Sequence, residues 1–449
     1  MRKRTVFLLA ASFLPRPLPG AEAPAEPPAA GRAAEAFRAA RSALPFEIHG
    51  FGEGAIGWLP AKNRYLRNHS FNLMEGRTQL KTLYYPEFWA PLADSGAALS
   101  AKLDLVGDGI SEDFRAEFRE LNARLTPLRW LDVKVGRQIL TWGTGDLVFL
   151  NDLFPKDWVS FFSGRDDEYL KRPSDALKVG AFHEWANGEF VLIPFFTPDN
   201  PIRGERLSFY DPLQGGITGR ENDLHFNRPA TALKHMEYAG RLYRSVGSYE
   251  VAAYAFKGFY KQALGVDDPS AGDLYHPRLA ALGSSVRGPV PRAGGIGNME
   301  FAWYNSEENR RGDNPAVEPP GLRYLAGYER DLWRDFTLGL QYYAEEMLGY
   351  GEYRRSAPPE APFSRDRFRQ LLTARLTQRL FQQNAAASIF AFFSPTDADF
   401  HLRPRLSWNA TDRWSVTVGA DVCAGRHGYT MFGQFKNDNQ LFARLRYGF

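Results

Sequence analysis

Arginines spaced by two or four residues are the side chains of this sequence best placed to act on a charged solute. The six candidates are Arg375, Arg379, Arg403, Arg405, Arg444 and Arg446. Because successive side chains of a β-strand point to opposite faces, arginines at even spacing share one face. Guanidinium groups that line a water-filled passage raise the local concentration of anions, so the pattern predicts a pore lining that favours anions.

A bracing role for the same arginines is the alternative interpretation. Acids such as Glu47, Asp421 and Glu345 lie in similar alternating segments and could pair with the guanidinium groups. Such pairs would hold a wall together without selecting any solute. Both interpretations stay open at this point.

A second set of candidates surrounds one long stretch, residues 143–174, between two alternating segments. Its singled-out acids and aromatic residues are Trp142, Asp146, Asp152, Phe154, Asp157 and Trp158. A loop this rich in rings should bury them, either at the rim of the protein or by folding inward, where it would constrict a passage. Its carboxylates would suit a hard cation, but EF-hand spacing is absent and we predict no metal site.

Enzymatic chemistry has no signature in this sequence. The motifs G-x-S-x-G, H-E-x-x-H, CxxC and the phosphate-binding loop are all missing. The eight histidines are scattered without metal-ligand spacing. We therefore predict neither an enzyme nor a cofactor.

The elements that position these residues are segments in which apolar and polar residues alternate with a period of two. Within residues 441–449 and again within 414–422, every second residue is apolar and the residues between them are mostly polar. This period predicts β-strands with one apolar and one wet face. The expected strands are 46–58, 78–90, 97–106, 112–125, 131–142, 175–185, 189–197, 232–245, 249–260, 278–288, 295–304, 322–331, 336–346, 368–381, 385–394, 400–409, 414–423 and 440–449.

The connections between these strands alternate in length. Short ones such as 246–248 and 410–413 alternate with long ones such as 143–174 and 198–231. We also expect Ala186-Asn187-Gly188 to form a primed hairpin turn, because Asn-Gly tolerates the positive φ angles of such turns. Short periplasmic turns that alternate with long extracellular loops are typical of outer-membrane barrels.

We therefore predict an all-β fold, a transmembrane antiparallel β-barrel of about 18 strands, within a range of roughly 14–18. A secreted β-sandwich or propeller is the alternative, but no repeat at a fixed period supports it. The mean hydropathy of −0.39 and the absence of any stretch of 18 apolar residues exclude an inner-membrane helical protein.

The N-terminal residues have the pattern of a secretory signal peptide. Arg2 to Arg4 supply positive charge, Val6 to Leu14 an apolar core, and Ala21-Glu22-Ala23 a small-residue cleavage context. We predict a signal peptide over residues 1–23, a periplasmic Ala/Pro-rich linker over 24–44 and the barrel over 45–449. The lone Cys423 cannot form an internal disulfide, and the formal charge of +3 gives no argument for a nucleic-acid partner.

Two motifs carry a resemblance to known families. The last strand, ending in Phe449, resembles the signal by which Gram-negative assembly machinery recognises outer-membrane barrels. A second motif resembles a poorly characterised group of porin-like outer-membrane proteins. It consists of Gly136-Arg137-Gln138, Trp142-Gly143, Asp146 and the stretch Asn151-Asp152-Leu153-Phe154-Pro155-Lys156-Asp157. Phe154 stands where that group would have Asn.

The resemblance implies a barrel in the outer membrane, of the porin or alginate-export type. Its implied partners are outer-membrane lipid and lipopolysaccharide, the barrel-assembly machinery and a second copy of the chain. The sequence thus predicts a channel for passive diffusion of small or chain-like anionic solutes, narrowed by residues 143–174. The alternative is a non-conducting barrel that serves as a surface receptor, adhesin or scaffold for a partner in the pore.

Overall fold

The computed structural model describes residues 47–86, 95–357 and 365–449. The predicted signal peptide, 1–23, and linker, 24–44, lie outside these residues. Within the described part, no helix is long and apolar enough to cross a membrane.

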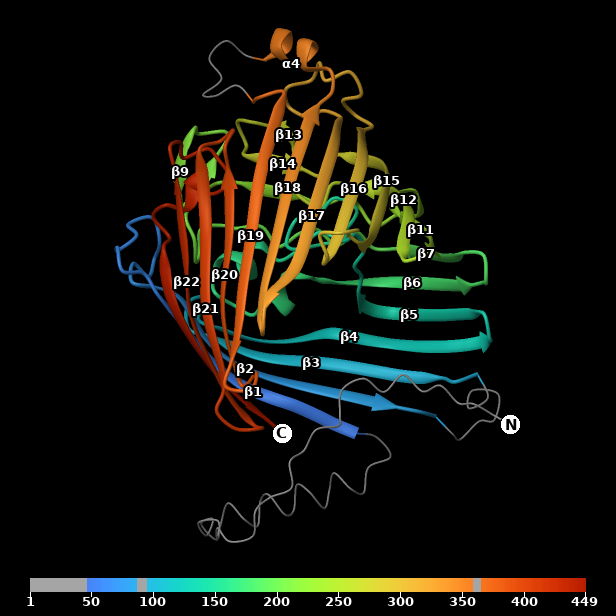
Figure 1. Ribbon diagram of the computed structural model, residues 1–449. Helices are drawn as coiled ribbons and strands as arrows, with labels where there is room; N and C mark the ends of the chain where they lie inside the picture. Colours follow the sequence, from blue (N-terminus) through green and yellow to red (C-terminus); the bar gives the residue numbers. More distant parts are fainter. Residues whose placement is uncertain (1–46, 87–94, 358–364) are drawn as a thin grey trace, which may run out of the picture. The chain divides into compact units, whose positions relative to one another are not determined.

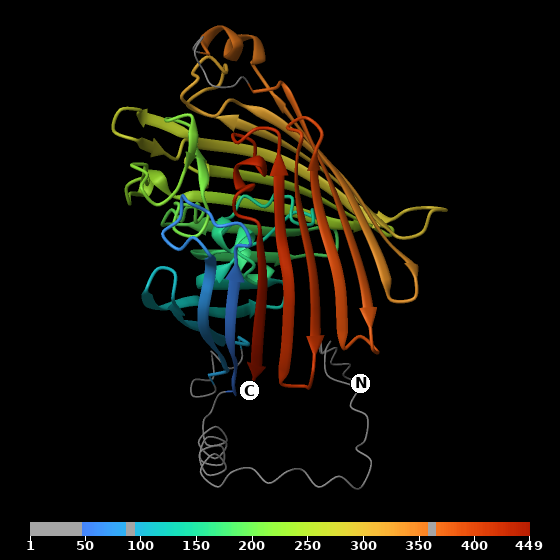
Figure 2. The same cartoon turned by 90° about the vertical axis from the view of Figure 1, so that its left-hand side faces the viewer.

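Eighteen antiparallel strands form one closed barrel (Figures 1 and 2). Each strand pairs with its neighbours along the chain, and β1 also pairs with β23, with Gly54 opposite Leu445, which closes the sheet. The strands are β1 (Glu47–Trp58), β2 (Phe71–Tyr84), β3 (Ala98–Asp108), β4 (Asp113–Leu128), β5 (Leu131–Ile139), β6 (Pro173–Phe182), β7 (Asn187–Ile193), β11 (Glu237–Val246), β12 (Tyr249–Phe259), β15 (Arg278–Pro289), β16 (Ile296–Ser306), β17 (Gly321–Trp333), β18 (Phe336–Met347), β19 (Phe368–Leu380), β20 (Ala385–Ser394), β21 (Asp399–Asn409), β22 (Trp414–Gly425) and β23 (Gln440–Gly448). The predicted all-β barrel is confirmed.

Alternate residues of each strand face opposite sides of the barrel wall. On β23, Leu441 and Leu445 are 49% and 48% exposed, whereas Phe442 and Arg444 between them are buried. On β21 the exposed residues include Leu406, and the buried ones include Arg403. The apolar side chains therefore cover the outside of the barrel, and the polar ones point into it.

Strand β2 differs most from its predicted bounds, since it spans 71–84 in place of 78–90. Pro86 follows the strand, and a proline has no N–H to continue the ladder. The missed first half carries Glu75 and Arg77, which point into the barrel and are buried there. Gly76 and Thr78 stand at outward positions where the pattern would have large apolar residues, and Leu73 is buried in the register of Glu75, which is why the sequence pattern did not reveal this half.

The predicted Asn-Gly turn was wrong. Phe182 pairs with Asn187, so the turn consists of residues 183–186, and Asn187 and Gly188 already belong to β7. Neither of the two has a positive φ angle. Within the turn, the backbone N–H of Trp185 approaches His183 Nδ1 at 3.5 Å and their rings are in contact.

Long loops carry small elements at one end of the barrel, toward the top of Figure 1. They include a hairpin of β8 (Phe209–Asp211) and β9 (Gly216–Thr218) and the helix α4 (Tyr350–Ser356). A three-stranded sheet combines β10 (His225–Asn227), β13 (Gly265–Asp268) and β14 (Asp273–Tyr275). The short helices are η2 (Leu233–His235) and η3 (Gly433–Phe435).

Candidate pore and inner loop

The connection between β5 and β6, residues 140–172, is called the inner loop below. It contains a short helix α3 (Trp158–Phe162) and a single helical turn η1 (Asp167–Leu170). Asp157 caps α3 by accepting a hydrogen bond from Ser160 N at 2.8 Å, and Asp166 caps η1 in the same way. These local bonds give the loop a defined backbone.

The first end of the inner loop is attached to β16, β18 and β19. Glu300 of β16 accepts hydrogen bonds from Thr144 Oγ1 at 2.8 Å and Gly145 N at 2.9 Å. Asp146 accepts two hydrogen bonds from Arg375 of β19, at 2.5 and 2.9 Å. Gln341 of β18 accepts from Asp146 N at 2.7 Å. Residues 144–146, called the loop tip below, are therefore held by residues that point into the barrel.

The second end is attached to β21 and β23 through ion pairs. Asp167 lies 2.8 Å from Arg403 and 3.0 Å from Arg405, and Asp166 lies 2.9 Å from Arg444. Burial alone would raise the pKa of Asp167, but the two guanidinium charges outweigh it and lower that pKa to about 2. The loop carboxylates are thus ionised partners of the arginines on the wall.

The same end of the loop also contacts the N-terminal strands. Arg165 is buried and pairs with Glu75 of β2. Arg119 of β4 donates to the backbone carbonyls of Glu168 and Lys171 at 2.9 and 3.0 Å. Contacts to β2 and β4 as well as to β16–β19 mean that the loop reaches inward-facing residues on separated parts of the wall.

Aromatic rings fill the space around α3. Phe161 and Phe162 pack edge to face with their ring centroids 4.8 Å apart, and both contact the ring of His401. Phe392 of β20 and Phe432 of the last long loop complete the cluster. The loop is therefore fixed by apolar burial as well as by ion pairs.

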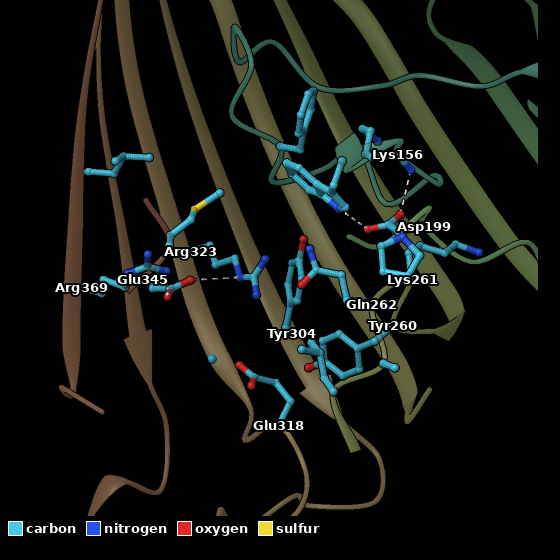
Figure 3. A pocket seen from close by; sticks show the side chains of 18 of the residues that line it. Lys156, Asp199, Tyr260, Lys261, Gln262, Tyr304, Glu318, Arg323, Glu345 and Arg369 are labelled. Carbon is cyan, nitrogen blue, oxygen red and sulfur yellow. Dashed lines mark hydrogen bonds and ion pairs between the residues drawn. The ribbon is translucent and has the colours of Figure 1, made fainter. Parts of the chain in front are cut away.

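Beside the inner loop lies a cavity of about 1050 Å³ (Figure 3). It is lined by inner-loop residues such as Phe149 and Trp158, by strands β16–β19 and by the long loops that follow β7, β12 and β22. Arg323 of β17 points into it, 3.9 Å from Glu345 and with its guanidinium 3.9 Å from the Tyr304 ring centroid. This cavity is called the vestibule below.

The remaining charges of the vestibule are mostly paired. Arg365 donates to both carboxylate oxygens of Glu318, at 2.6 and 2.9 Å, and Arg369 donates to Asp397 at 2.5 Å. Burial lowers the pKa of His276 to about 4, which keeps this loop imidazole neutral at pH 7. Among the described residues, no group of three or more His, Cys, Asp or Glu side chains is placed to hold a metal ion.

Sequence comparison gives no relative, since no protein-family model and no curated protein matches the chain. Solved structures do match. Acinetobacter baumannii OccAB3 has a TM-score of 0.56 at 9% identity, over 90% of this chain and 99% of that chain. Pseudomonas aeruginosa OccK2 (OpdF), solved in complex with glucuronate, has a TM-score of 0.54 at 9% identity, over 90% and 95%. Pseudomonas aeruginosa OpdQ has a TM-score of 0.54 at 10% identity, over 90% and 98%.

These neighbours are outer-membrane porins with an 18-stranded barrel. The chain shares their barrel fold. At this level of identity the similarity establishes the architecture and not the solute. The functional argument therefore depends on the residues of this chain.

The six predicted arginines fall into three groups. Arg403, Arg405, Arg444 and Arg446 lie together and share Asp166 and Asp167 of the inner loop as partners. Arg375 pairs with Asp146 at the loop tip. Arg379 lies on the same face of β19, is exposed, and has no ion pair within the described part of the chain. Of the predicted bracing acids, Asp421 pairs with Arg403, and Glu345 lies near Arg323 and Arg369; the side chain of Glu47 lies outside the described residues.

The predicted loop residues bind partly within the inner loop and partly to neighbouring elements. Trp142 donates to Glu189 at 2.8 Å and packs on Phe154, and Asp152 pairs with Lys156 at 3.0 Å. Trp158 donates to Asp199 at 2.7 Å. Asp157 is the cap of α3, and only Asp146 reaches an arginine of the predicted set.

Sequence reasoning missed Glu300 and Arg323. Both are charged residues at inward-facing positions, Glu300 on β16 and Arg323 on β17. Their alternating position could have marked them as facing the inside of the barrel. Their partners, Thr144 and Tyr304, could not be found without the folded loop.

Proposed function

We propose that the protein is a passive channel of the outer membrane, through which small solutes diffuse past a constriction formed by the inner loop. The observation that carries this proposal is the attachment of the loop to inward-facing residues at both ends, through Arg375–Asp146 and Arg403–Asp167. A loop held in this way narrows a barrel lumen without a chemical step. Solutes would enter through the vestibule.

The proposed charge preference is for anions. Arg379 is exposed on the inner face and has no ion pair among the described residues, whereas Arg405 is paired with Asp167 at 3.0 Å. Guanidinium donors that no carboxylate uses attract anions more strongly than cations. Because most other arginines have acidic partners, we expect the preference to be modest.

A non-conducting barrel is the competing function. The packing of Phe161 and Phe162 against His401 and Phe392 would favour it if these rings block the lumen. A receptor, adhesin or scaffold would then use the long loops as its binding surface. A measurement of solute permeation distinguishes the passive channel from the non-conducting barrel.

Liposome swelling with sugars and carboxylates of increasing size tests the proposal. The native protein should admit small solutes, and deletion of Val148 to Arg165 should admit larger ones. Heat-modifiable migration shows whether the shortened barrel still folds, and Trp158→Ala serves as a milder second variant. If the native protein and the folded deletion protein have the same size limit, the inner loop does not narrow the pore. If neither protein gives swelling, the non-conducting scaffold is favoured.

The predicted partners stay predictions. The backbone of Phe449 exchanges two hydrogen bonds with Gly50, at 3.0 and 3.1 Å, so the last residue belongs to the closing seam. We propose that this strand is the segment the assembly machinery recognises. Contacts with lipopolysaccharide and with a second copy of the chain are proposed for the apolar outside of the barrel.

A further inference from the structure

Asp438 is a buried carboxyl group where three loops meet. It is 4% exposed and lies in the loop between β22 and β23, just after η3. Its Oδ1 accepts hydrogen bonds from Asn63 Nδ2 at 2.7 Å and Ser208 N at 3.0 Å, and its Oδ2 accepts from Ser208 Oγ at 2.8 Å. Asn63 belongs to the β1–β2 loop and Ser208 to the β7–β11 loop, so one side chain joins all three.

No cation compensates this carboxyl group within the described part of the chain. The cations within two residues of Asn63, Ser208 or Asp438 are otherwise engaged or exposed: Arg206 pairs with Glu75 and Asp108, and Lys62, Arg64 and Lys436 are exposed. His69 uses its Nδ1 on the carbonyl of Asn63 at 2.8 Å. Other titratable or charged groups on the packed elements include Tyr65, Arg67, Arg203, Glu205, Tyr210, Asp211, Arg220, Glu221, Asp223, Asp399, Cys423, Arg426, His427 and Tyr429.

The junction holds the β8–β9 hairpin against the last long loop. Tyr210 N donates to Gln434 Oε1 at 3.1 Å, and the rings of Tyr210 and Tyr429 are 6.2 Å apart. Phe209 of the hairpin and Phe432 of the last loop both line the vestibule. Release of the hairpin would therefore open one side of the vestibule.

We propose that Asp438 is a pH-sensitive latch, which holds the β8–β9 hairpin closed against the last loop in acid and weakens this closure as the pH rises to neutral. The physical reason is the cost of burying an ionised carboxylate without a counter-charge. The neutral acid has no such cost, and its hydroxyl can donate to Ser208 Oγ. The latch itself is independent of the proposed channel function, and only its effect on current rests on that function.

The expected pH window follows from the titration of the closed state. Burial raises the pKa of Asp438 from its usual 3.8 to about 7, although three hydrogen bonds oppose the shift. The closed form therefore binds the proton more tightly than the open form. Its population relative to the open form should fall about tenfold per pH unit between pH 4 and 7, and stay constant above that range.

Distances between two spin labels test the latch in the full chain reconstituted in lipid. One label replaces Gln214 at the exposed hairpin tip and the other replaces Ala398 at the exposed turn between β20 and β21, in a Cys423→Ala background. In the chain with the native junction, the fraction of molecules with the longer distance between the two labels should grow from pH 4.5 to 7.5. Asp438→Asn, which keeps the shape but cannot ionise, should show the short distance at every pH.

Two further variants keep the test decisive. Ser208→Ala removes one hydrogen-bond donor to the ionised carboxylate of Asp438. The hairpin of this variant should therefore continue to open up to a higher pH than the hairpin of the native chain. Glu221→Gln removes an exposed acid of the same loop and should behave like the native chain. Identical distances at pH 4.5 and 7.5 in the native chain, or a native-like response in Asp438→Asn, would overturn the latch. If distances respond to pH but the protein conducts no current, the channel function fails and the latch stands.

Discussion

Asp167 of the inner loop lies 2.8 Å from the guanidinium of Arg403 on β21, 236 positions further along the chain. Arg403 is 2% exposed and also donates to Asp421. One arginine thus joins a loop carboxylate to a wall carboxylate in a buried site. This relationship makes the arginines part of the support for the loop.

Replacing Arg403 with Met should destabilise the protein. The substitution leaves Asp421 and Asp167 without their shared cation, and breaking a buried pair in this way costs about 3–5 kcal/mol. Urea unfolding of the folded barrel measures the loss. In the Arg403→Met background, Asp167→Asn should restore part of the lost stability. If the losses of stability caused by the two substitutions are strictly additive, the two residues do not act as a pair.

The loop tip provides a test with less effect on stability. Arg375 and Asp146 are 33% and 46% exposed, so Arg375→Gln should cost less than about 1 kcal/mol of stability. It should nevertheless increase fluctuations of single-channel current, because the tip loses one attachment. Arg379→Gln removes the same charge from the same face of β19 without a loop contact. Equal noise in both variants would contradict a role for the pair in holding the tip.

Charge reversal at Arg379 should change selectivity without moving the loop. Arg379→Glu places a negative charge on the inner face, so the reversal potential in a salt gradient should shift toward cations. Arg330→Glu is the matched control, because Arg330 is exposed on the opposite face of β17. A shift of equal size in the control would mean that the effect arises outside the lumen.

Acid should release the second end of the loop only at very low pH. The pKa of Asp167 is lowered to about 2, so its pairing contributes above the usual pKa of 3.8 and is lost as the pH falls through about 2. The free energy of unfolding of the native protein should therefore decrease more between pH 5 and 2 than that of Asp167→Asn. Both are compared in the Asp438→Asn background. Parallel curves would count against this ion pair.

The barrel could be predicted from the sequence because alternation is a local property. Leu441 and Leu445 face outward and Phe442 and Arg444 inward for the same reason that makes the pattern visible in the chain. The pattern failed in the first half of β2, where Gly76 and Thr78 stand at outward positions and Leu73 is buried on the other register. It also failed at Asn187, where a dipeptide typical of turns instead begins a strand.

The candidate site could be predicted only in part. Even spacing placed the arginines on the inner face, and the aromatic content of the inner loop indicated burial. The pairing of Arg403 with Asp167, or of Glu300 with Thr144, depends on which parts of the wall the folded loop reaches. No local pattern contains that information.

Single-channel recording of the refolded native protein in a planar bilayer, under a tenfold gradient of KCl, tests the central claim most directly. Our account predicts steady unitary currents with a reversal potential shifted modestly to the anion side. A protein that is folded by heat-modifiable migration and yet gives no unitary current would contradict the channel, and a cation-side reversal potential would contradict the proposed role of the arginines.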